Sequence, residues 1–538
     1  MQSRWYQNAV FYAVDIDVFR DTNGDGYGDF DGLTESLDYL AWLGVDALWL
    51  LPFYSGPYMD NGYDISNYYD VASRLGSLGT FTHFMTEAER RGIRVVLDLV
   101  VQHTSSQHPW FIEARGKRHA KYRDYYVWTQ DPASEHGYHS AFPGTGSHVW
   151  QFDPKAGSYY LHRFYDFEPT LNTAHSSVQD EIHWIMDFWL RLGAAGFRVD
   201  AAALLRSTPG PEPSTPHPLL RKMRSWAVER KPDAPLIGEV DVAPDHLSDY
   251  FAGGDELAVL YNFPLAAYLF LAFAREQAEP IRHALKLVPA APEGCQWFTF
   301  LRNLDELNLA LLSDDETAQV MAAFAPDPRM RIFDRGIRRR LATMLGGDRR
   351  RIELAYSLLF SLPGSPFITY GDEIGMGEDL AYPERYSVRV PMQWSTDDPN
   401  GGFTSADPSA LVRPVISNGP FGFPRVNVAD QRRDPGSLLH WMRQLMHVRK
   451  SCPEIGEGRL TLLDVDSPSV FAHTYDSESA TLVAVHNLSS DPQTVSIHMQ
   501  TPHGAEKVLG QDVDVQNAHD NLRLRLPGYG YLWLRWSK

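Results

Sequence analysis

The chain has 538 residues, which exceeds the size at which a single hydrophobic core stops growing, so two or three structural units are expected. Apolar residues make up 43% and charged residues 22%, as in ordinary globular proteins. The formal net charge of −19 argues against nucleic-acid binding, which requires concentrated Lys and Arg. The chain has only two cysteines, Cys295 and Cys452, which excludes a disulfide framework.

The first residues, MQSRWYQNAVFY, lack the basic start, the apolar run and the cleavage site of a secretory signal, so we expect a cytoplasmic protein. Residues 257–274 carry no charge and approach the length of a membrane span. Asn262 and Pro264 interrupt this stretch, which is therefore better interpreted as a buried strand followed by a helix. No membrane association is expected.

Short apolar segments bounded by Gly, Pro or Asp alternate with longer amphipathic stretches along the first 370 residues. This is the pattern of βα units around a parallel sheet. In chain order, the predicted strands are 10–18, 47–53, 95–101, 196–200, 235–240, 258–263, 297–302 and 366–370. Eight such strands predict an α/β fold of the closed (β/α)8 TIM-barrel type.

Two regions depart from this pattern. Residues 104–171 form an unusually long connection after the third strand, which predicts an inserted subdomain over the C-terminal face of the barrel. Beyond a helix near Leu438, six alternating segments predict a C-terminal antiparallel β domain: RLTLLDV, SVFAHTY, TLVAVHNL, TVSIHM, LRLRL and YLWLRW. The predicted units are a catalytic barrel at 1–103 and 172–450, an inserted subdomain at 104–171, and a C-terminal β-sandwich at 451–538.

Polar side chains follow several predicted strands, at the edge where barrel enzymes place their active sites. A single acidic residue among 68 is usually a solvated surface charge, so these side chains gain meaning only because they converge on one edge. They are Asp98 with His103, Arg198 with Asp200, Glu239, and Asn303 with Asp305.

The same residues belong to motifs with a specific order and spacing. These are NGYD at Asn61, DLVVQH at Asp98, GFRVD at Gly196, GEV at Gly238 and RNLDE at Arg302. Through them the chain resembles glycoside hydrolase family 13, the α-amylase superfamily. Further segments, among them SLPGSPFITYGDEIGMG and VRVPMQW, resemble the trehalose synthases within that family, and the resemblance covers nearly the whole chain.

The resemblance implies a retaining mechanism with two carboxylates. Asp200 matches the family's nucleophile, Glu239 its general acid and base, and Asp305 the carboxylate that binds sugar hydroxyls and stabilises the transition state. Such a mechanism needs an ionised carboxylate and a protonated acid about 5–5.5 Å apart. Arg198, two residues before Asp200, lies on the same strand face and can keep Asp200 ionised by charge pairing.

Further positions match the family's −1 subsite, which holds the glucosyl ring. They are Asp60, Tyr63, His103 and Arg389, of which Tyr63 would supply a stacking platform. Leu304, beside Asp305, stands where the family has His, so an apolar group is predicted in the pocket where a hydrogen-bond donor is usual. Two interpretations stay open: a pocket re-cut for a different sugar, or a degenerate relative with weak activity.

A second cluster places oxygen ligands at alternate positions, with glycines between them. Its spacing and hard ligands are typical of a calcium loop, although an acidic surface turn has the same composition. The matching loop in related family members binds Ca²⁺ or Mg²⁺, and the residue at Tyr27 contributes its backbone carbonyl. We therefore expect one structural Ca²⁺ or Mg²⁺ ion and no organic cofactor. The candidate ligands are Asp21, Asn23, Asp25, Tyr27 and Asp29.

Other departures from the family concern a different calcium site and a loop. Family members usually have Asn at Gln102 and Asp at Thr170, and these ligate a calcium between the barrel and the inserted subdomain. Losing both predicts that this site is absent. The segment STPGPEPSTPHP, after the strand that carries Asp200, replaces the polar loop of trehalose synthases.

Three functions are compatible with these residues. The leading hypothesis is an enzyme resembling trehalose synthase, which transfers or hydrolyses glucosyl units of short α-glucosides such as maltose or trehalose through a glucosyl-enzyme intermediate. The alternative is an intracellular α-glucosidase with a re-cut −1 subsite, and a non-catalytic sugar-binding relative comes third. The expected partner is a small α-glucoside, and the oligomeric state stays open, with a homodimer as one option.

Overall fold

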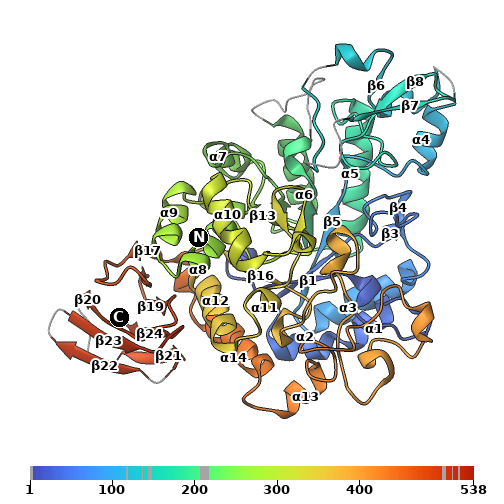
Figure 1. The fold of residues 1–538 in the computed structure, drawn as a ribbon. Coiled ribbons are helices and arrows are strands. Elements are labelled where there is room, and N and C mark those ends of the chain that lie inside the picture. Colours follow the sequence, from blue (N-terminus) through green and yellow to red (C-terminus); the bar gives the residue numbers. More distant parts are fainter. Residues whose placement is uncertain are drawn as a thin grey trace.

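A computed structural model describes residues 4–116, 119–135, 137–142, 148–205, 217–499, 505–511, 513–518 and 521–538. These residues form a closed barrel of eight parallel strands surrounded by helices, an inserted antiparallel segment, and two C-terminal antiparallel sheets (Figure 1). The predicted (β/α)8 barrel and C-terminal β domain are confirmed, whereas the residue boundaries between the units stay a prediction.

The barrel strands pair in parallel around the whole ring, and the last strand pairs again with the first. Each observed strand lies within a predicted segment or begins one residue before it. Most are shorter than predicted, because the residues after them turn into the loops that carry the polar side chains. The strands are β1 (Phe11–Val14), β2 (Ala47–Leu50), β5 (Arg94–Leu99), β9 (Gly196–Val199), β10 (Leu236–Gly238), β11 (Val259–Tyr261), β12 (Gln296–Thr299) and β16 (Ser365–Thr369).

Helices with one apolar face cover the outside of the barrel. The uncharged stretch at 257–274 forms β11 and the buried helix α8, as expected, and no helix in the described residues is long and apolar enough to cross a membrane. The helices of the barrel region are α1 (Phe30–Glu35), α2 (Leu37–Leu43), α3 (Leu78–Arg90), α5 (Ser176–Arg191), α6 (Pro218–Arg230), α7 (Leu247–Phe251), α8 (Phe263–Arg275), α9 (Glu279–Leu287), α10 (Asp314–Phe324), α11 (Leu341–Met344), α12 (Arg349–Ser361), α13 (Val428–Arg433) and α14 (Leu438–Ser451).

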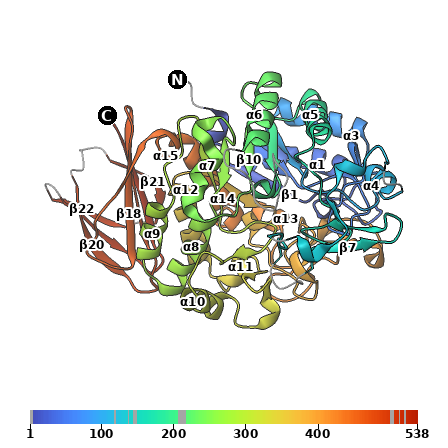
Figure 2. The same ribbon diagram turned by 90° about the horizontal axis from the view of Figure 1, so that it is seen from above.

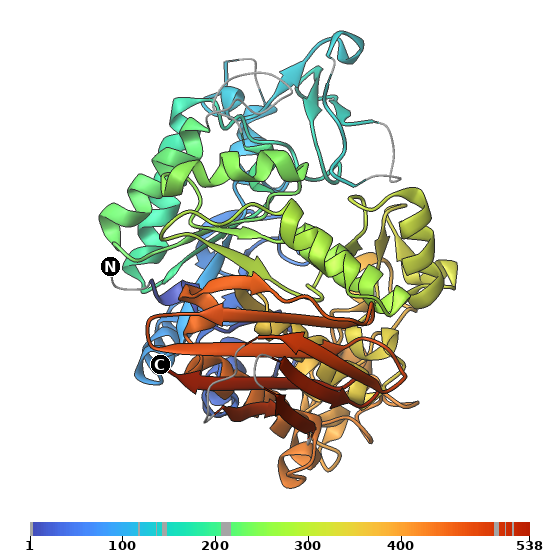
Figure 3. The ribbon, with the colours of Figure 1, turned by 90° about the vertical axis from the view of Figure 1, so that its left-hand side faces the viewer.

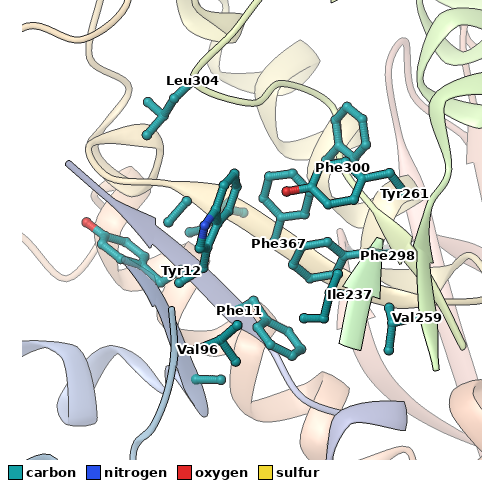
Figure 4. Packing of buried hydrophobic residues seen from close by; sticks show 14 of the residues in the cluster. Phe11, Tyr12, Val96, Ile237, Val259, Tyr261, Phe298, Phe300, Leu304 and Phe367 are labelled. Carbon is teal, nitrogen blue, oxygen red and sulfur yellow. The ribbon is translucent and has the colours of Figure 1, made fainter. Parts of the chain in front are cut away.

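Aromatic rings fill the inside of the barrel (Figure 4). Phe298 packs edge-on against Phe11, with ring centroids 4.8 Å apart, and stacks on Phe367 at 4.3 Å. Trp49 packs edge-on against Tyr261, which in turn contacts Phe298 and Phe367. Because protein interiors are close-packed, these large rings make a rigid floor for the polar side chains at the strand ends.

Two small antiparallel sheets lie near the C-terminal edge of the barrel. The inserted segment contains helix α4 (Pro109–Ala114) and a three-stranded sheet, while a second sheet follows β12 and includes a tight hairpin. The strands of the first are β6 (Trp128–Thr129), β7 (Trp150–Asp153) and β8 (Ser158–Leu161), and those of the second are β13 (Leu307–Asn308), β14 (Arg331–Ile332) and β15 (Gly336–Ile337). The pair β3 (Tyr54–Ser55) and β4 (Asn67–Val71) follows β2.

The C-terminal strands form two facing sheets on the side of the barrel away from the inserted segment (Figure 2). The first sheet has the order β17 (Arg459–Leu462), β18 (Val470–Asp476), β19 (Ala480–Asn487), β24 (Tyr531–Ser537) and β21 (Glu506–Gly510), and the second β20 (Gln493–His498), β23 (Asn521–Leu526) and β22 (Asp514–Ala518). Short helix α15 (Glu454–Glu457) precedes them.

Strand β19 is buried along its whole length because both its faces are covered. Figure 3 looks onto the C-terminal strands where they lie against the rest of the molecule. Val483 and Val485 face the core between the two C-terminal sheets, while Leu482 and Ala484 belong to the main core shared with the barrel. On the barrel side, the Ser357 hydroxyl of α12 lies 3.0 Å from His486 Nε2 of β19. The same hydroxyl accepts a hydrogen bond from the Trp533 indole of the neighbouring strand β24. The C-terminal sheets are therefore packed onto the barrel rather than tethered to it.

Candidate active site

A pocket of about 280 Å³ opens at the C-terminal edge of the barrel strands, which is near the lower end of the usual range for small-molecule sites. The inserted segment and the β13–β15 sheet also contribute to its walls. It brings together most residues that the sequence singled out, namely Asp60, Tyr63, His103, Arg198, Asp200, Glu239 and Asp305.

Arg198 lies at the centre of the site, and three carboxylates contact its guanidinium. Its Nη1 lies 2.8 Å from Asp98 Oδ1 and 2.5 Å from Asp200 Oδ1, and its Nη2 lies 2.7 Å from Glu239 Oε2. The guanidinium rests on the aromatic floor, 5.2 Å from the ring centre of Trp49. Because one guanidinium holds both Asp200 and Glu239, the two carboxylates lie side by side, as a retaining mechanism requires.

Asp200 and Glu239 have different pKa values, which suits them to different roles. Burial raises the pKa of Glu239 to about 7 and that of Asp200 to about 6, although the charge of Arg198 opposes both increases. Near neutral pH, Asp200 is then mostly ionised while Glu239 still carries its proton in about half of the molecules. Such a pair can supply one nucleophilic carboxylate beside one proton donor.

The turn after Asp200 has a strained backbone, which places a hydrogen-bond donor beside Glu239. Ala201 has a φ of 42°, a left-handed conformation that non-glycine residues seldom adopt. This conformation directs the Ala201 amide to donate a hydrogen bond of 3.0 Å to Glu239 Oε2. Backbone strain of this kind persists where the surrounding structure requires it, which is common at functional sites.

Asp305 differs from the other carboxylates because arginines surround it. Arg385 Nη1 lies 3.0 Å and Arg389 Nη2 2.7 Å from its Oδ1. Burial alone would raise the pKa of Asp305, but Arg389, Arg385 and Arg198 together outweigh it and lower this pKa to about 2. Arg385 also reaches Asp60 Oδ1 at 2.5 Å, so one side chain joins two walls of the pocket.

Tyr63 and His103 form the wall next to this ion-pair network. The Tyr63 hydroxyl donates a hydrogen bond of 3.2 Å to Asp98 Oδ2, and the carbonyl of Tyr63 lies 3.2 Å from His103 Nε2. Burial lowers the pKa of His103 to about 4, so its imidazole is neutral near pH 7. A neutral imidazole can exchange hydrogen bonds with a sugar hydroxyl without adding charge to the pocket.

Two predicted binding residues do not line the pocket. Arg389 is 1% exposed, and it donates to Asp305 and to the backbone oxygen of Leu304, so it positions the carboxylate. Leu304 is also 1% exposed and packs within the hydrophobic core (Figure 4), while its neighbours Asn303 and Asp305 line the pocket. The predicted roles of Arg389 and Leu304 in holding the sugar stay predictions.

Several pocket residues were missed by sequence reasoning. Asp241 could have been found, because it lies only two residues after Glu239, in the loop that follows the same strand end. Arg385 precedes Arg389 by one helical turn, but no motif identified it. Others come from the inserted segment, whose contacts with the pocket the sequence does not reveal, and from the β13–β15 sheet, which it did not predict. Among them are Phe142, Arg163, Asn308 and Arg335.

The predicted metal loop is tightly wound by its own side chains. Asp21 Oδ1 accepts hydrogen bonds from the amides of Asn23 and Gly24, and its Oδ2 accepts from Gly26. The Asn23 side chain accepts from the amide of Asp25 in the same way. Gly26 must be glycine, because its φ is 92° and a Cβ atom would lie 2.2 Å from a backbone oxygen.

The donor set of this loop mixes carboxylate, amide and carbonyl oxygens. In the described residues, no group of three or more His, Cys, Asp or Glu side chains is arranged to hold a metal ion. A cation here would depend on the Asn23 amide and the Tyr27 carbonyl as well as the acids. Gln102 and Thr170 line a common pocket elsewhere, between barrel and inserted segment. Residues 207–216, which make up most of the proline-rich segment, lie outside the described residues.

Comparison with known proteins agrees with this geometry. Residues 16–458 match the family described as alpha amylase, catalytic domain, and residues 480–535 match a sucrose hydrolase-like C-terminal domain. The chain is 39% identical to a trehalose synthase of Pimelobacter sp. over 99% of this chain and 96% of that one. It is also 39% identical to a trehalose synthase/amylase of Mycobacterium tuberculosis, over 99% and 90% of the two chains.

Solved structures show the same architecture. The trehalulose synthase MutB from Pseudomonas mesoacidophila superposes with a TM-score of 0.79 at 27% identity, over 100% of both chains. An α-amylase from H. orenii superposes with a TM-score of 0.80 at 25% identity, over 99% of this chain and 100% of that one. Barrel and carboxylate pair together define a retaining glycosidase or transglycosidase. The chain belongs to the α-amylase family, glycoside hydrolase family 13.

Proposed function

We propose that the protein converts maltose and trehalose into one another by transferring a glucosyl unit through a covalent intermediate. The observation that carries this proposal is the site centred on Arg198, where an ionisable Asp200 and a protonatable Glu239 contact the same guanidinium. Relatives at about 40% identity over nearly the full chain, which are named trehalose synthases, support the choice of substrate.

The mechanism follows from the placement of each group. Asp200 attacks the anomeric carbon of the bound glucosyl unit, and Glu239 gives its proton to the departing oxygen. Asp305, kept ionised by two arginines, accepts hydrogen bonds from ring hydroxyls and stabilises positive charge that develops on the sugar. Glu239, now ionised, takes a proton from the acceptor that attacks the glucosyl-enzyme, and the anomeric configuration is retained.

Hydrolysis is the competing outcome, because water can serve as the acceptor. A relative that is 29% identical to this chain is named an oligo-1,6-glucosidase, so hydrolysis is the alternative activity to test. Incubation with maltose separates them: trehalose should appear as the main product and free glucose as a minor one. Glucose as the main product throughout the reaction would assign the protein to the α-glucosidases instead.

We also propose that the loop at Asp21–Asp29 holds one hard cation with a structural role. The support is its donor set, in which side-chain oxygens at alternate positions are held by backbone amides of the same loop. The loop residues fit a calcium or magnesium ion better than a softer metal, since all its donors are oxygen. We further propose a cytoplasmic location, which is consistent with two free, buried cysteines.

A further inference from the structure

Arg385 joins two carboxylates that belong to different loops of the pocket. Its Nη2 lies 2.5 Å from Asp60 Oδ1, and its Nη1 lies 3.0 Å from Asp305 Oδ1. The guanidinium also lies 5.9 Å from the ring centre of Tyr63 and 5.1 Å from that of Phe142. The separation between Asp60 and Asp305 therefore depends on where the chain places Arg385.

Arg385 belongs to a short 3₁₀ turn, Glu384–Ser387, whose first residue has a strained backbone. Glu384 has a φ of 43°, a left-handed conformation that residues other than glycine seldom adopt. Strain of this kind persists only where the surrounding contacts require it. The contacts that hold Glu384 therefore also determine the position of the next residue, Arg385.

The Glu384 side chain is held by the inserted segment, where the Tyr165 hydroxyl donates a hydrogen bond to Glu384 Oε2. Tyr165 is itself fixed, because its ring stacks on Phe167 with centroids 5.1 Å apart and planes 6° from parallel. Its backbone oxygen accepts from the Glu168 amide at 3.0 Å, and its amide donates to Glu168 Oε2 at 3.3 Å. Neither Tyr165 nor Glu384 is among the described residues that line the pocket, so they can act on a ligand only through their neighbours.

The turn formed by Tyr165 and Glu168 also reaches His103, which lines the pocket. Glu168 is completely buried, and its Oε1 lies 3.6 Å from His103 Nε2. This oxygen has no hydrogen-bond partner within the described part of the chain. One turn of the inserted segment is therefore in contact with a pocket residue at one end and with the neighbour of Arg385 at the other.

The rest of the Glu384–Ser387 turn is held by other elements around the pocket. The Ser387 hydroxyl lies 3.1 Å from the backbone oxygen of Arg338, which follows β15. The Tyr386 hydroxyl donates at 3.2 Å to the backbone oxygen of Met59, the residue before Asp60. These contacts hold the end of the turn, while the inserted segment holds its beginning.

We propose that Tyr165 and Glu384 are positioning residues for the part of the pocket that binds the glucosyl unit. By holding Arg385, they set the separation of Asp60 and Asp305, the carboxylates expected to accept from glucosyl hydroxyls. The proposal rests on the function proposed above only in that a glucosyl unit occupies the pocket, and it holds for transfer and hydrolysis alike. Docking of the inserted segment then completes the binding site.

Loss of the Tyr165–Glu384 contact should affect binding more than chemistry. Asp200 and Glu239, which carry out the bond-breaking steps, contact Arg198 and are not held by Arg385. If Arg385 occupies its place in only a fraction of the molecules, the apparent affinity for the glucosyl unit falls by that fraction. The change should therefore appear mainly in KM and be independent of the leaving group.

The test measures KM and kcat of single and double variants. We expect Tyr165→Phe to raise KM about tenfold and to change kcat less than about threefold, on maltose and on nitrophenyl α-glucoside alike, because it removes one hydrogen bond to a carboxylate. Glu384→Ala should have the same effect and the double variant no larger one, since both changes remove the same contact. Glu384→Gln, which keeps a carbonyl oxygen for the Tyr165 hydroxyl, should stay close to the wild-type protein. The matched control is Tyr159→Phe, at a tyrosine of the same inserted segment that packs on the exposed Phe152, and it should change neither constant.

The outcomes distinguish this proposal from the proposed function. If the wild-type protein cleaves no α-glucoside, the proposed function fails, and calorimetric binding of deoxynojirimycin, a glucose-shaped inhibitor, tests the positioning pair instead: Tyr165→Phe should weaken it and Tyr159→Phe should not. An unchanged KM in a Tyr165→Phe protein whose thermal melting shows that it is folded would overturn the proposal. So would a loss confined to kcat, or a double variant in which the two single losses multiply.

Discussion

Three carboxylates share one guanidinium at the centre of the site, and this crowding determines where the proton lies. Asp98 is fully buried, Asp200 nearly so, and Glu239 is the most exposed of the three. Burial raises the pKa of each, and mutual repulsion among the carboxylates adds to the increase. A single positive charge cannot balance three negative ones, so the carboxylates compete for protons, and Glu239, with the highest pKa of the three, keeps its proton to the highest pH.

Removal of either member of the catalytic pair should abolish turnover. We expect Asp200→Ala to eliminate formation of the covalent intermediate and Glu239→Gln to lower kcat by at least about 10²–10⁴, because neither group can perform the other's step. Initial rates on maltose and on an aryl glucoside measure both effects. A Glu239→Gln protein that keeps most of its activity would show that another residue donates the proton.

The pH dependence of kcat/KM should report the same pair. Asp200 must be ionised and Glu239 protonated, so activity falls below a pKa of about 6 and again above one of about 7. The expected profile is a narrow bell with its maximum between these values. A plateau that extends well into the alkaline range would mean that Glu239 loses its proton later than its surroundings suggest.

At the scale of single residues, the sequence predicted which carboxylates meet in the pocket but not the residues that position them. Asp200, Glu239 and Asp305 could be placed because each lies in a motif at the end of a strand. Arg385, which pairs with both Asp305 and Asp60, could not be predicted, because it reaches them from a loop more than 80 residues beyond β12. The sequence also did not predict the direction of the Leu304 side chain. Its neighbours Asn303 and Asp305 line the pocket while Leu304 is buried in the core, so a shift of one residue along the loop reverses the direction.

At the level of elements, two segments far apart in sequence meet over the pocket. Phe142 of the inserted segment stacks on Phe333 of the β14–β15 hairpin, with ring centroids 4.5 Å apart and planes 9° from parallel. Phe142 also lines the pocket, and the guanidinium of Arg385 lies 5.1 Å from its ring centre. This aromatic contact joins the inserted segment to the hairpin beside the pocket, and we expect it to limit the access of water.

Loss of the stack should favour hydrolysis over transfer. A ring pair of this kind contributes about 0.5–1.5 kcal/mol beyond its buried area, so Phe333→Ala should raise the ratio of glucose to trehalose up to about tenfold. Product analysis from maltose measures this ratio. Phe333→Leu, which keeps apolar bulk, serves as the control and should have a smaller effect; an unchanged ratio in Phe333→Ala would mean that water enters elsewhere.

The fold itself was largely predictable at this level. Eight apolar segments with βα spacing gave the barrel, and alternation gave six of the C-terminal strands. Strands β21 and β22 were missed because EKVLG and DVQNA contain too few apolar residues to alternate visibly. The small sheet β13–β15 was missed as well, since its two-residue strands carry no periodic signal.

For the whole molecule, the loop at Asp21 joins distant parts of the chain. The Asp21 amide donates to the backbone oxygen of Phe403 at 2.9 Å, and its side chain accepts from the Thr404 hydroxyl. A cation bound here would therefore stabilise the contact between the first βα loop and the region around residue 400. Binding energy of this kind adds to folding stability because the unfolded chain has no such site.

Chelation should accordingly lower the melting temperature more than it lowers kcat. We expect a protein treated with a strong chelator to unfold at a lower temperature and to recover on addition of Ca²⁺. Asp25→Asn, which removes one exposed carboxylate of the loop, should weaken this response. Elemental analysis that finds neither Ca²⁺ nor Mg²⁺ in protein purified without chelator would contradict the site.

Strand β19, buried on both faces, makes the catalytic barrel and the C-terminal sheets inseparable in practice. A gene truncated before residue 451 would leave the outer faces of α12 and α14 without their cover, including Ser357 and Trp441, which bond to Trp533 and Tyr531. The excised sheets would in turn expose Leu482 and Ala484 along a hydrophobic strand. Both fragments would present the kind of surface that drives aggregation, so any engineered fusion or shortened version of this enzyme should keep the two parts in one chain.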